Sequence, residues 1–133
     1  MSLEENKALV RRWVEARNNH DLPAALPLWV DEMHERLTRA FNRFTEAFPD
    51  LHVTIEEMIA EGDKVVLLWT LTGTHGGLYR GIPATGAAVR WRVIDIYTVA
   101  NGRLATTHVR EADSLQLLKQ LGVTAHWQGM AIE

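Results

Sequence analysis

The chain has 133 residues, of which 47% are hydrophobic and 23% charged, values typical of one globular domain. Its formal net charge of −3 argues against nucleic acid or an anionic membrane as a partner, and the lack of Cys excludes disulfides and thiol chemistry. Neither a secretory signal nor a membrane-spanning stretch is recognisable, so we expect a single domain over residues 1–133 in the cytoplasm.

The first third of the chain has the apolar periodicity of helices. Ser2 and Glu5 have the spacing of a capping box, and apolar residues then recur at helical intervals, which predicts a helix over residues 2–19. A second, shorter helix is expected over residues 21–29. A third helix is predicted over residues 33–48, because apolar residues recur along one face of this segment. The proline that follows ends it.

The rest of the chain changes to the periodicity of strands. Apolar residues recur with a period of two, and the pattern predicts two antiparallel hairpins with strands at residues 51–61, 64–76, 87–100 and 103–113. Ser114 can cap a last helix, which Gly122 ends. Helices followed by antiparallel strands predict an α+β fold, in which a curved sheet wraps around the helices and encloses a pocket.

The sequence favours chemistry without metal or cofactor. Its six His include no metal-binding spacing, and its glycines match neither nucleotide-binding pattern. The two serines lie at a chain end and at a probable helix cap, so a serine nucleophile has almost no candidate. We therefore expect no metal and no cofactor, and acid–base chemistry by carboxylates and imidazoles remains.

Asp95 is unusual because the alternation of its strand places it on the same face as Trp91, Val93 and Tyr97. A carboxylate on an apolar face requires a partner or a function. It is either a structural group paired with a nearby arginine, or a catalytic base whose pKa is raised by burial.

Asp113 follows the last long strand and precedes the last helix, where its side chain could reach the mouth of the pocket as a general base. The alternative is that it caps the helix together with Ser114. His108 lies five residues earlier on the same strand, so it faces the opposite side from Asp113 unless a β-bulge intervenes.

Aromatic residues supply a large flat apolar surface, which suits an aromatic ligand or forms part of the core: Trp13, Trp29, Trp69, Trp91 and Tyr97. His75 shares a strand face with Trp69 beside the glycine-rich connection, where it lines the pocket entrance or faces solvent.

Short motifs along the chain resemble the SnoaL-like polyketide cyclases. They are Ala47-Phe48-Pro49-Asp50-Leu51, Glu61-Gly62-Asp63-Lys64-Val65, Trp69-Thr70, Thr72-Gly73-Thr74-His75, Gly81-Ile82-Pro83, Thr85-Gly86, Ile94-Asp95-Ile96-Tyr97, Asn101-Gly102-Arg103-Leu104 and Leu118-Lys119-Gln120-Leu121-Gly122. Their order and spacing make the resemblance strong for fold and family.

The resemblance implies a nuclear-transport-factor-2-like cone with an internal pocket, paired as a homodimer through the sheet. It also implies a cofactor-free intramolecular aldol reaction on an aromatic polyketide. Asp113 would then be the acid/base and His108 its assistant. Two departures from the family pattern stand out: the second and third helices are joined without the usual strand and loop, and one extra residue lies between Leu104 and Asp113.

Two alternatives to this function follow from the residues. A non-catalytic binding domain would keep the aromatic pocket and use Asp113 only as a helix cap. An enzyme with another reaction, such as isomerisation, dehydration or epoxide opening, would use Asp95 as its base, because fold does not fix reaction. In every case the expected ligand is a small apolar or aromatic molecule.

Overall fold

The computed structural model describes residues 2–123, 125–127 and 130–132, with side chains up to residue 123 apart from His108 and Val109. The helices come first, at α1 (Leu3–Asn18), α2 (Leu22–Ala25) and α3 (His34–Ala47), with short 3-10 turns at Leu26–Leu28 and Asp31–Met33. The capping box at the start of α1 is present, since the Ser2 hydroxyl accepts from the Glu5 amide at 3.1 Å.

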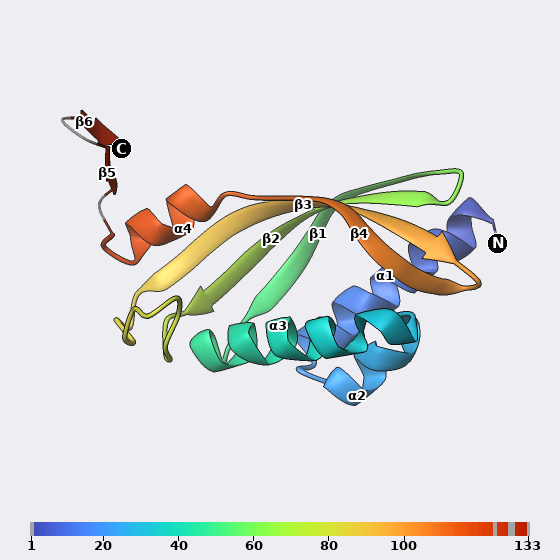
Figure 1. Cartoon of the computed structure of the whole chain (residues 1–133), viewed down its shortest axis with the longest axis horizontal. Helices are drawn as coiled ribbons and strands as arrows, with labels where there is room; N and C mark the ends of the chain where they lie inside the picture. The colour runs from blue at the N-terminus through green and yellow to red at the C-terminus, as the bar shows by residue number, and fades with distance from the viewer. Residues whose placement is uncertain (1, 124, 128–129, 133) are drawn as a thin grey trace.

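Four antiparallel strands form one sheet in the order β1-β2-β3-β4 (Figure 1). They are β1 (His52–Glu61), β2 (Lys64–Thr74), β3 (Ala88–Ala100) and β4 (Arg103–Ala112). A last helix, α4 (Ser114–Gln120), and two short paired strands, β5 (Ala125–Trp127) and β6 (Met130–Ile132), follow. The α+β class with a curved antiparallel sheet is confirmed, whereas the β5–β6 pair was not predicted.

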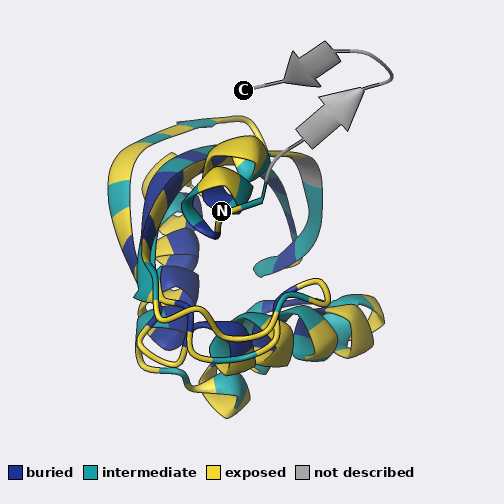
Figure 2. Ribbon diagram, turned by 90° about the vertical axis from the view of Figure 1, so that its left-hand side faces the viewer, coloured by how far each residue is buried: buried dark blue, intermediate teal, exposed yellow. Residues whose placement is uncertain are grey.

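The sheet arches over the helices, and one face of each central strand is buried (Figure 2). Along β3 the buried and exposed residues alternate as the period of two predicts, with Val89, Trp91, Val93, Asp95 and Tyr97 all inward. The apolar sides of α1 and α3 pack below this concave face and complete the core. Asp95 is therefore the single carboxylate among the buried residues of the described chain.

Strand β4 contains two register shifts that reorganise its side chains. Ile96 pairs with Val109 and Tyr97 with Thr107, which leaves His108 as an extra residue in β4. A second shift lies between the Thr98–Thr106 and Val99–Leu104 pairs. These irregularities absorb extra residues before Asp113, and they bring Thr107 and Arg110 to the same cavity.

The short link between α2 and α3 is fastened to the far edge of the sheet. Trp29 forms a parallel bridge with Leu104, where the Val30 amide donates to the Leu104 carbonyl at 2.9 Å. Arg103 adds a hydrogen bond to the Trp29 carbonyl at 3.3 Å. Trp29 thus joins the helical part of the chain to β4, the edge strand of the sheet.

The glycine-rich connection between β2 and β3 is packed against the end of α3. The amides of Gly76 and Gly77 both donate to the Ala47 carbonyl, at 2.9 and 3.2 Å. A Cβ at Gly77 would collide with the Glu46 carbonyl, so only glycine fits this approach. Among the described residues, no helix has the length and hydropathy needed to cross a membrane.

Candidate functional site

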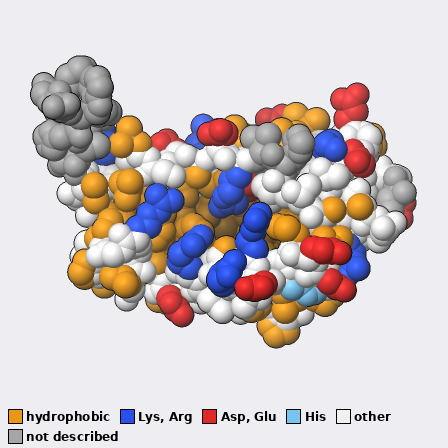
Figure 3. Space-filling view, viewed as in Figure 1, with side chains coloured by type: hydrophobic (Ala, Val, Ile, Leu, Met, Phe, Trp, Pro, Cys, Tyr) orange, Lys and Arg blue, Asp and Glu red, His pale blue; other side chains and the backbone are white. Residues whose placement is uncertain are grey.

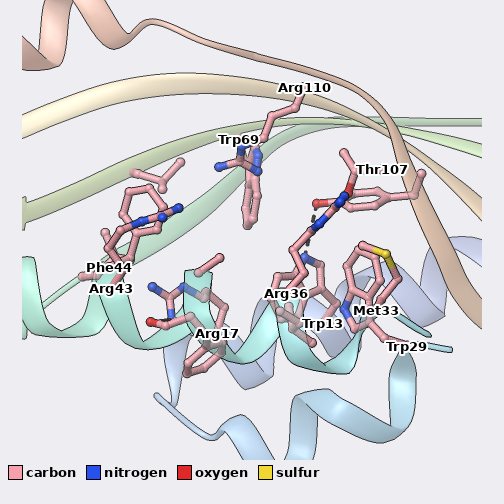
Figure 4. Close-up of a pocket in the computed structure, with 16 residues that line it drawn as sticks. Trp13, Arg17, Trp29, Met33, Arg36, Arg43, Phe44, Trp69, Thr107 and Arg110 are labelled. Atoms are coloured by element: carbon pink, nitrogen blue, oxygen red, sulfur yellow. Dashed lines mark hydrogen bonds between the residues drawn. The ribbon is translucent and has the colours of Figure 1, made fainter. Parts of the chain in front are cut away.

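A cavity of about 390 Å³ lies between α1, α3 and the concave face of the sheet (Figure 4). This volume is in the range of small-molecule sites. The sheet side is formed mainly by aromatic and polar residues of β2, β3 and β4, namely Trp69, Leu71, Tyr97, Thr107 and Arg110. The helix side contributes aromatic rings and three arginines, among them Trp13, Arg17, Arg36, Phe41, Arg43 and Phe44.

A buried carboxylate lies directly behind the sheet wall of this cavity. Asp95 is 0% exposed, and its Oδ2 accepts from Trp69 Nε1 at 2.8 Å and from the Tyr97 hydroxyl at 3.2 Å. Nη1 of Arg110 donates to both carboxylate oxygens at 3.1 Å. The structure therefore has Asp95 as a buried charge paired with an arginine, the first of the two roles that its sequence position allows. This arginine lies on the neighbouring strand β4, directly opposite Asp95 in register.

Burial dominates the electrostatics of this cluster. It raises the pKa of the Asp95 carboxyl, and the Arg110 charge with the hydrogen bonds from Tyr97 and Trp69 offsets part of the rise. Burial, followed by the negative charge of Asp95, also holds the pKa of Tyr97 well above its usual value of 10. The Tyr97 hydroxyl therefore remains a proton donor at neutral pH.

The hydrogen-bonded cluster continues into an aromatic layer on α1 and the α2–α3 link. Trp13 Nε1 donates to the Tyr97 hydroxyl at 3.2 Å, and the Trp13 and Trp29 rings meet edge to face with centroids 5.6 Å apart. Four of the six residues expected to line the pocket lie in its wall: Trp13, Trp29, Trp69 and Tyr97.

The other two expected lining residues lie elsewhere in the core. Trp91 is buried against Phe44 and Phe48 at the C-terminal end of α3, and it is not among the residues that line the cavity. His75 is 0% exposed, and its Nδ1 accepts from the Thr85 amide at 3.2 Å within the glycine-rich connection. It therefore lines neither the cavity nor the solvent-facing entrance that its place beside a glycine-rich loop suggested.

Asp113 does not face the cavity. Its side chain is exposed and accepts from the Gln116 amide at 3.2 Å, so it is the N-cap of α4, and Ser114 is the first residue of that helix. It lies in a shallow hollow on the outer face with Arg92, Ile94 and Glu111. The reason is the register of β4: Arg110 and Ala112 pair with inward residues, which turns Glu111 and then Asp113 outward.

The expected partner of Asp113, His108, has a side chain outside the described residues. The chain path places it at a register shift of β4, between the cavity residue Thr107 and Val109. The first-choice pair of Asp113 and His108 is thus not assembled in the described part of the cavity.

The arginines of the cavity wall were not predicted as site residues, although the sequence carried a signal for the three that lie on helices. Arg17 continues the apolar stripe of α1, where a surface residue would not be expected. Arg36 and Arg43 are seven residues apart on α3 and therefore lie on the same side of the helix. In Figure 4 these arginines and Arg110 surround the cavity.

The geometry and the comparisons place the chain in a family. The model of the SnoaL-like polyketide cyclases matches residues 7–121, so the chain belongs to this family. It matches none of the curated proteins.

Several solved structures share the fold over almost the whole chain. AclR from Streptomyces galilaeus, for which a hydroxylase activity is proposed, is 28% identical with a TM-score of 0.83, over 91% of this chain and 98% of that one. TsrD from Streptomyces laurentii is 27% identical with a TM-score of 0.85, over 92% and 98%. A SnoaL-like protein from Jannaschia sp. CCS1, 20% identical over 89% and 92% with a TM-score of 0.75, shows the fold alone.

Proposed function

We propose that this protein is a cofactor-free acid/base enzyme of the polyketide-cyclase type, which closes a ring by an intramolecular aldol reaction on an aromatic ketone or ester. The observation that carries the proposal is a cavity lined by aromatic rings and backed by a buried carboxylate with a raised pKa. Metal and cofactor independence, like the cytoplasmic location, stays a prediction.

In this proposal the cluster on the sheet wall performs the proton transfers. Asp95 takes the proton from the carbon between the ketone and the ester, once Arg110 turns toward the substrate. The Arg110 side chain is 44% exposed, which leaves it room to turn. Arg110 stabilises the resulting enolate, whose carbon attacks the second carbonyl group and forms the new C–C bond. Tyr97 donates its hydroxyl proton to the oxygen of the attacked carbonyl and takes up the proton held by Asp95 across their 3.2 Å hydrogen bond, which restores both groups.

The experiment that tests the proposal compares three proteins on a panel of anthraquinone β-ketoesters: wild type, Asp95→Asn and Asp113→Asn. We expect cyclisation by the wild type, a loss on the order of a hundredfold in Asp95→Asn, and near-normal turnover in Asp113→Asn. Circular dichroism of each variant checks that the fold persists. A loss confined to Asp113→Asn would return the acid/base role to Asp113 and His108, the assignment that the family resemblance implies.

A second candidate function is a non-catalytic binding domain. It is favoured by the described cavity lining, which includes no Asp, Glu or His. Tight binding of aromatic ligands with no turnover of any substrate, including substrates for isomerisation, dehydration and epoxide opening, would establish this alternative.

We also propose that two copies pair through the outer face of the sheet, as the family resemblance implies. On this face Ile94 is 42% exposed beside Leu68, and Arg92 and Glu111 supply charges of both signs, which a two-fold interface can pair. Light scattering should give the mass of a dimer, and Ile94→Lys should give that of a monomer. A monomeric wild type would contradict the pairing.

A further inference from the structure

The cavity wall carries an excess of positive charge. Four arginines line it, and none of the described lining residues is acidic, although the whole chain has a net charge of −3. Figure 3 shows Lys and Arg side chains gathered around a hollow with hydrophobic walls. The positive charge is therefore local to the cavity and does not reflect the general surface.

Arg17 is the most informative of the four, because it is only 5% exposed. Its Nη1 donates to the Phe41 carbonyl at 3.3 Å and to the Thr45 hydroxyl at 3.2 Å, and its guanidinium stacks over the Phe41 ring at 4.2 Å. Its Nη2 is buried without a hydrogen-bond partner. No carboxylate of the described chain lies within ion-pair distance of Arg17, and a buried charge without a counter-ion is costly.

The charges of Arg17 and Arg110 interact across the cavity. Burial and the charge of Arg110 together lower the pKa of Arg17 to about 10. Arg17 therefore stays protonated at neutral pH, and the charge nearest to it across the cavity is that of Arg110, which is itself paired with Asp95. An anion placed between these two groups would relieve both the desolvation of Arg17 and the repulsion.

Arg36 and Arg43 extend the same pattern along α3. Neither forms a hydrogen bond or ion pair with any residue in the described ranges, whereas Arg39 on the same helix pairs with Glu35 at 3.1 Å. Arg39 does not line the cavity. Of these three arginines of α3, the two that line the cavity have no ion-pair partner in the described chain, and the one outside the cavity, Arg39, has one.

We propose that the cavity binds a small organic anion, with an aromatic body against the Trp and Phe rings and a carboxylate held by the arginines of α1 and α3. A guanidinium matches the plane and the two oxygens of a carboxylate, and the limited volume favours a small ligand over a nucleotide or peptide. The inference rests on the proposed function only in taking the cavity as a small-molecule site, and it is independent of the reaction.

The test uses anthraquinone-2-carboxylate and its methyl ester as probes, titrated into the full chain by calorimetry. The two probes share the aromatic body and differ in charge. We expect the acid to bind about tenfold or more tightly than the ester, as one charge-assisted hydrogen bond can provide, with an advantage that shrinks as salt is added.

Substitutions of the exposed arginines locate the charge. Arg36→Gln and Arg43→Gln should each weaken the acid about tenfold and leave the ester unchanged, while Arg39→Gln serves as the matched control and should change neither. These variants avoid the buried Arg17, whose replacement could disturb the fold.

The outcomes separate the anion site proposed here from the small-molecule cavity on which it rests. An ester that binds as tightly as the acid, or an Arg39→Gln loss equal to that of Arg36→Gln, would overturn the anion site and leave the small-molecule cavity standing. Binding of neither probe would overturn the anion site and the cavity's role together. A competition experiment with inorganic phosphate and benzoate tests whether the aromatic body matters. If phosphate displaces the acid as effectively as benzoate does, the site recognises charge alone, which also contradicts the proposal.

Discussion

The two walls of the cavity differ in how their polar groups are satisfied. On the sheet wall, Asp95 is hydrogen-bonded to Trp69 of β2, to Tyr97 of its own strand and to Arg110 of β4. On the helix wall, Arg17 keeps a bare buried nitrogen, and Arg36 and Arg43 have no described partner. The buried charge of the sheet wall has its counter-charge within the protein, whereas the buried charge of the helix wall has none in the described chain. The helix wall is therefore where an anionic ligand would supply the missing charge.

The largest effect on stability should follow a change at Asp95. We expect Asp95→Asn to lower the free energy of unfolding by about 2–3 kcal/mol, because it removes the counter-charge of Arg110 and replaces one of the two acceptor oxygens by an amide nitrogen that cannot accept from Arg110. The exposure of Arg110 keeps the effect below that of a fully buried pair. Urea unfolding measures it, with Asp113→Asn as a nearly neutral control, since Asn caps a helix as well as Asp does.

The pH dependence of the stability of wild type and Asp95→Asn checks the direction in which the pKa of Asp95 is shifted. Because the folded pKa is raised, the folded chain holds the Asp95 proton more strongly than the unfolded chain does. The stability that this provides is fully present below the ordinary carboxyl range and is lost as pH rises through the folded pKa. The stability of wild type relative to Asp95→Asn should therefore fall as pH rises through this window. A relative stability that increases there would mean that the Arg110 pairing outweighs burial.

Tyr97→Phe should have the next largest effect. It removes the acceptor of Trp13 Nε1 and one donor to Asp95 while it keeps the ring, so we expect a loss of about 1–2 kcal/mol in unfolding free energy. Tyr79→Phe is the control, because the Tyr79 side chain is buried without such a bond among the described residues. If Tyr97→Phe and Tyr79→Phe lowered the free energy of unfolding equally, the hydrogen bonds of the Tyr97 hydroxyl would not contribute to stability.

Loss of the α4 cap should be smaller. Asp113→Ala removes the acceptor of the Gln116 amide, which we expect to cost about 1 kcal/mol and to leave aromatic ligand affinity unchanged. Thermal unfolding and ligand titration of the same variant give both quantities. A large loss of affinity without loss of stability would place Asp113 in the binding site after all.

The smallest effects are expected on the helix wall. Arg36→Gln or Arg43→Gln should leave the free protein as stable as before or more stable by up to about 0.5 kcal/mol, since like charges are removed from one region. Denaturation without ligand measures this, with Arg39→Gln losing the few tenths of a kcal/mol of its pair with Glu35. A loss above 1 kcal/mol at Arg36 or Arg43 would mean that these arginines support the fold.

The sequence allowed the fold to be predicted because its signals are local. The capping box at Ser2, the change of period after Pro49 and the Asn101-Gly102 turn each act over a few residues, and the elements follow them closely. The inward placement of Asp95 also follows from strand alternation alone.

The site was less predictable because it depends on register and on distant pairing. Strand alternation could not reveal that β4 has two register shifts, so it could not decide between the general base and the helix cap for Asp113, and it could not name Arg110 as the arginine that pairs with Asp95. The amphipathic pattern of α3 likewise did not distinguish Arg39 from Arg36 and Arg43, which line the cavity. Only the position of the sheet decides which part of a helix borders a cavity.

The bridge between Trp29 and Leu104 has a consequence for ligand screening. It joins the helical part of the chain to the last long strand, and the cavity wall itself runs from Trp13 to Arg110. The cavity wall is assembled from residues far apart in the sequence, so a ligand has a site only when the helices and the sheet are folded together. Occupancy and global unfolding are then thermodynamically linked, and a ligand at a hundred times its Kd should add about 2.7 kcal/mol to the stability. A rise in melting temperature would thus report binding without any assumption about the reaction.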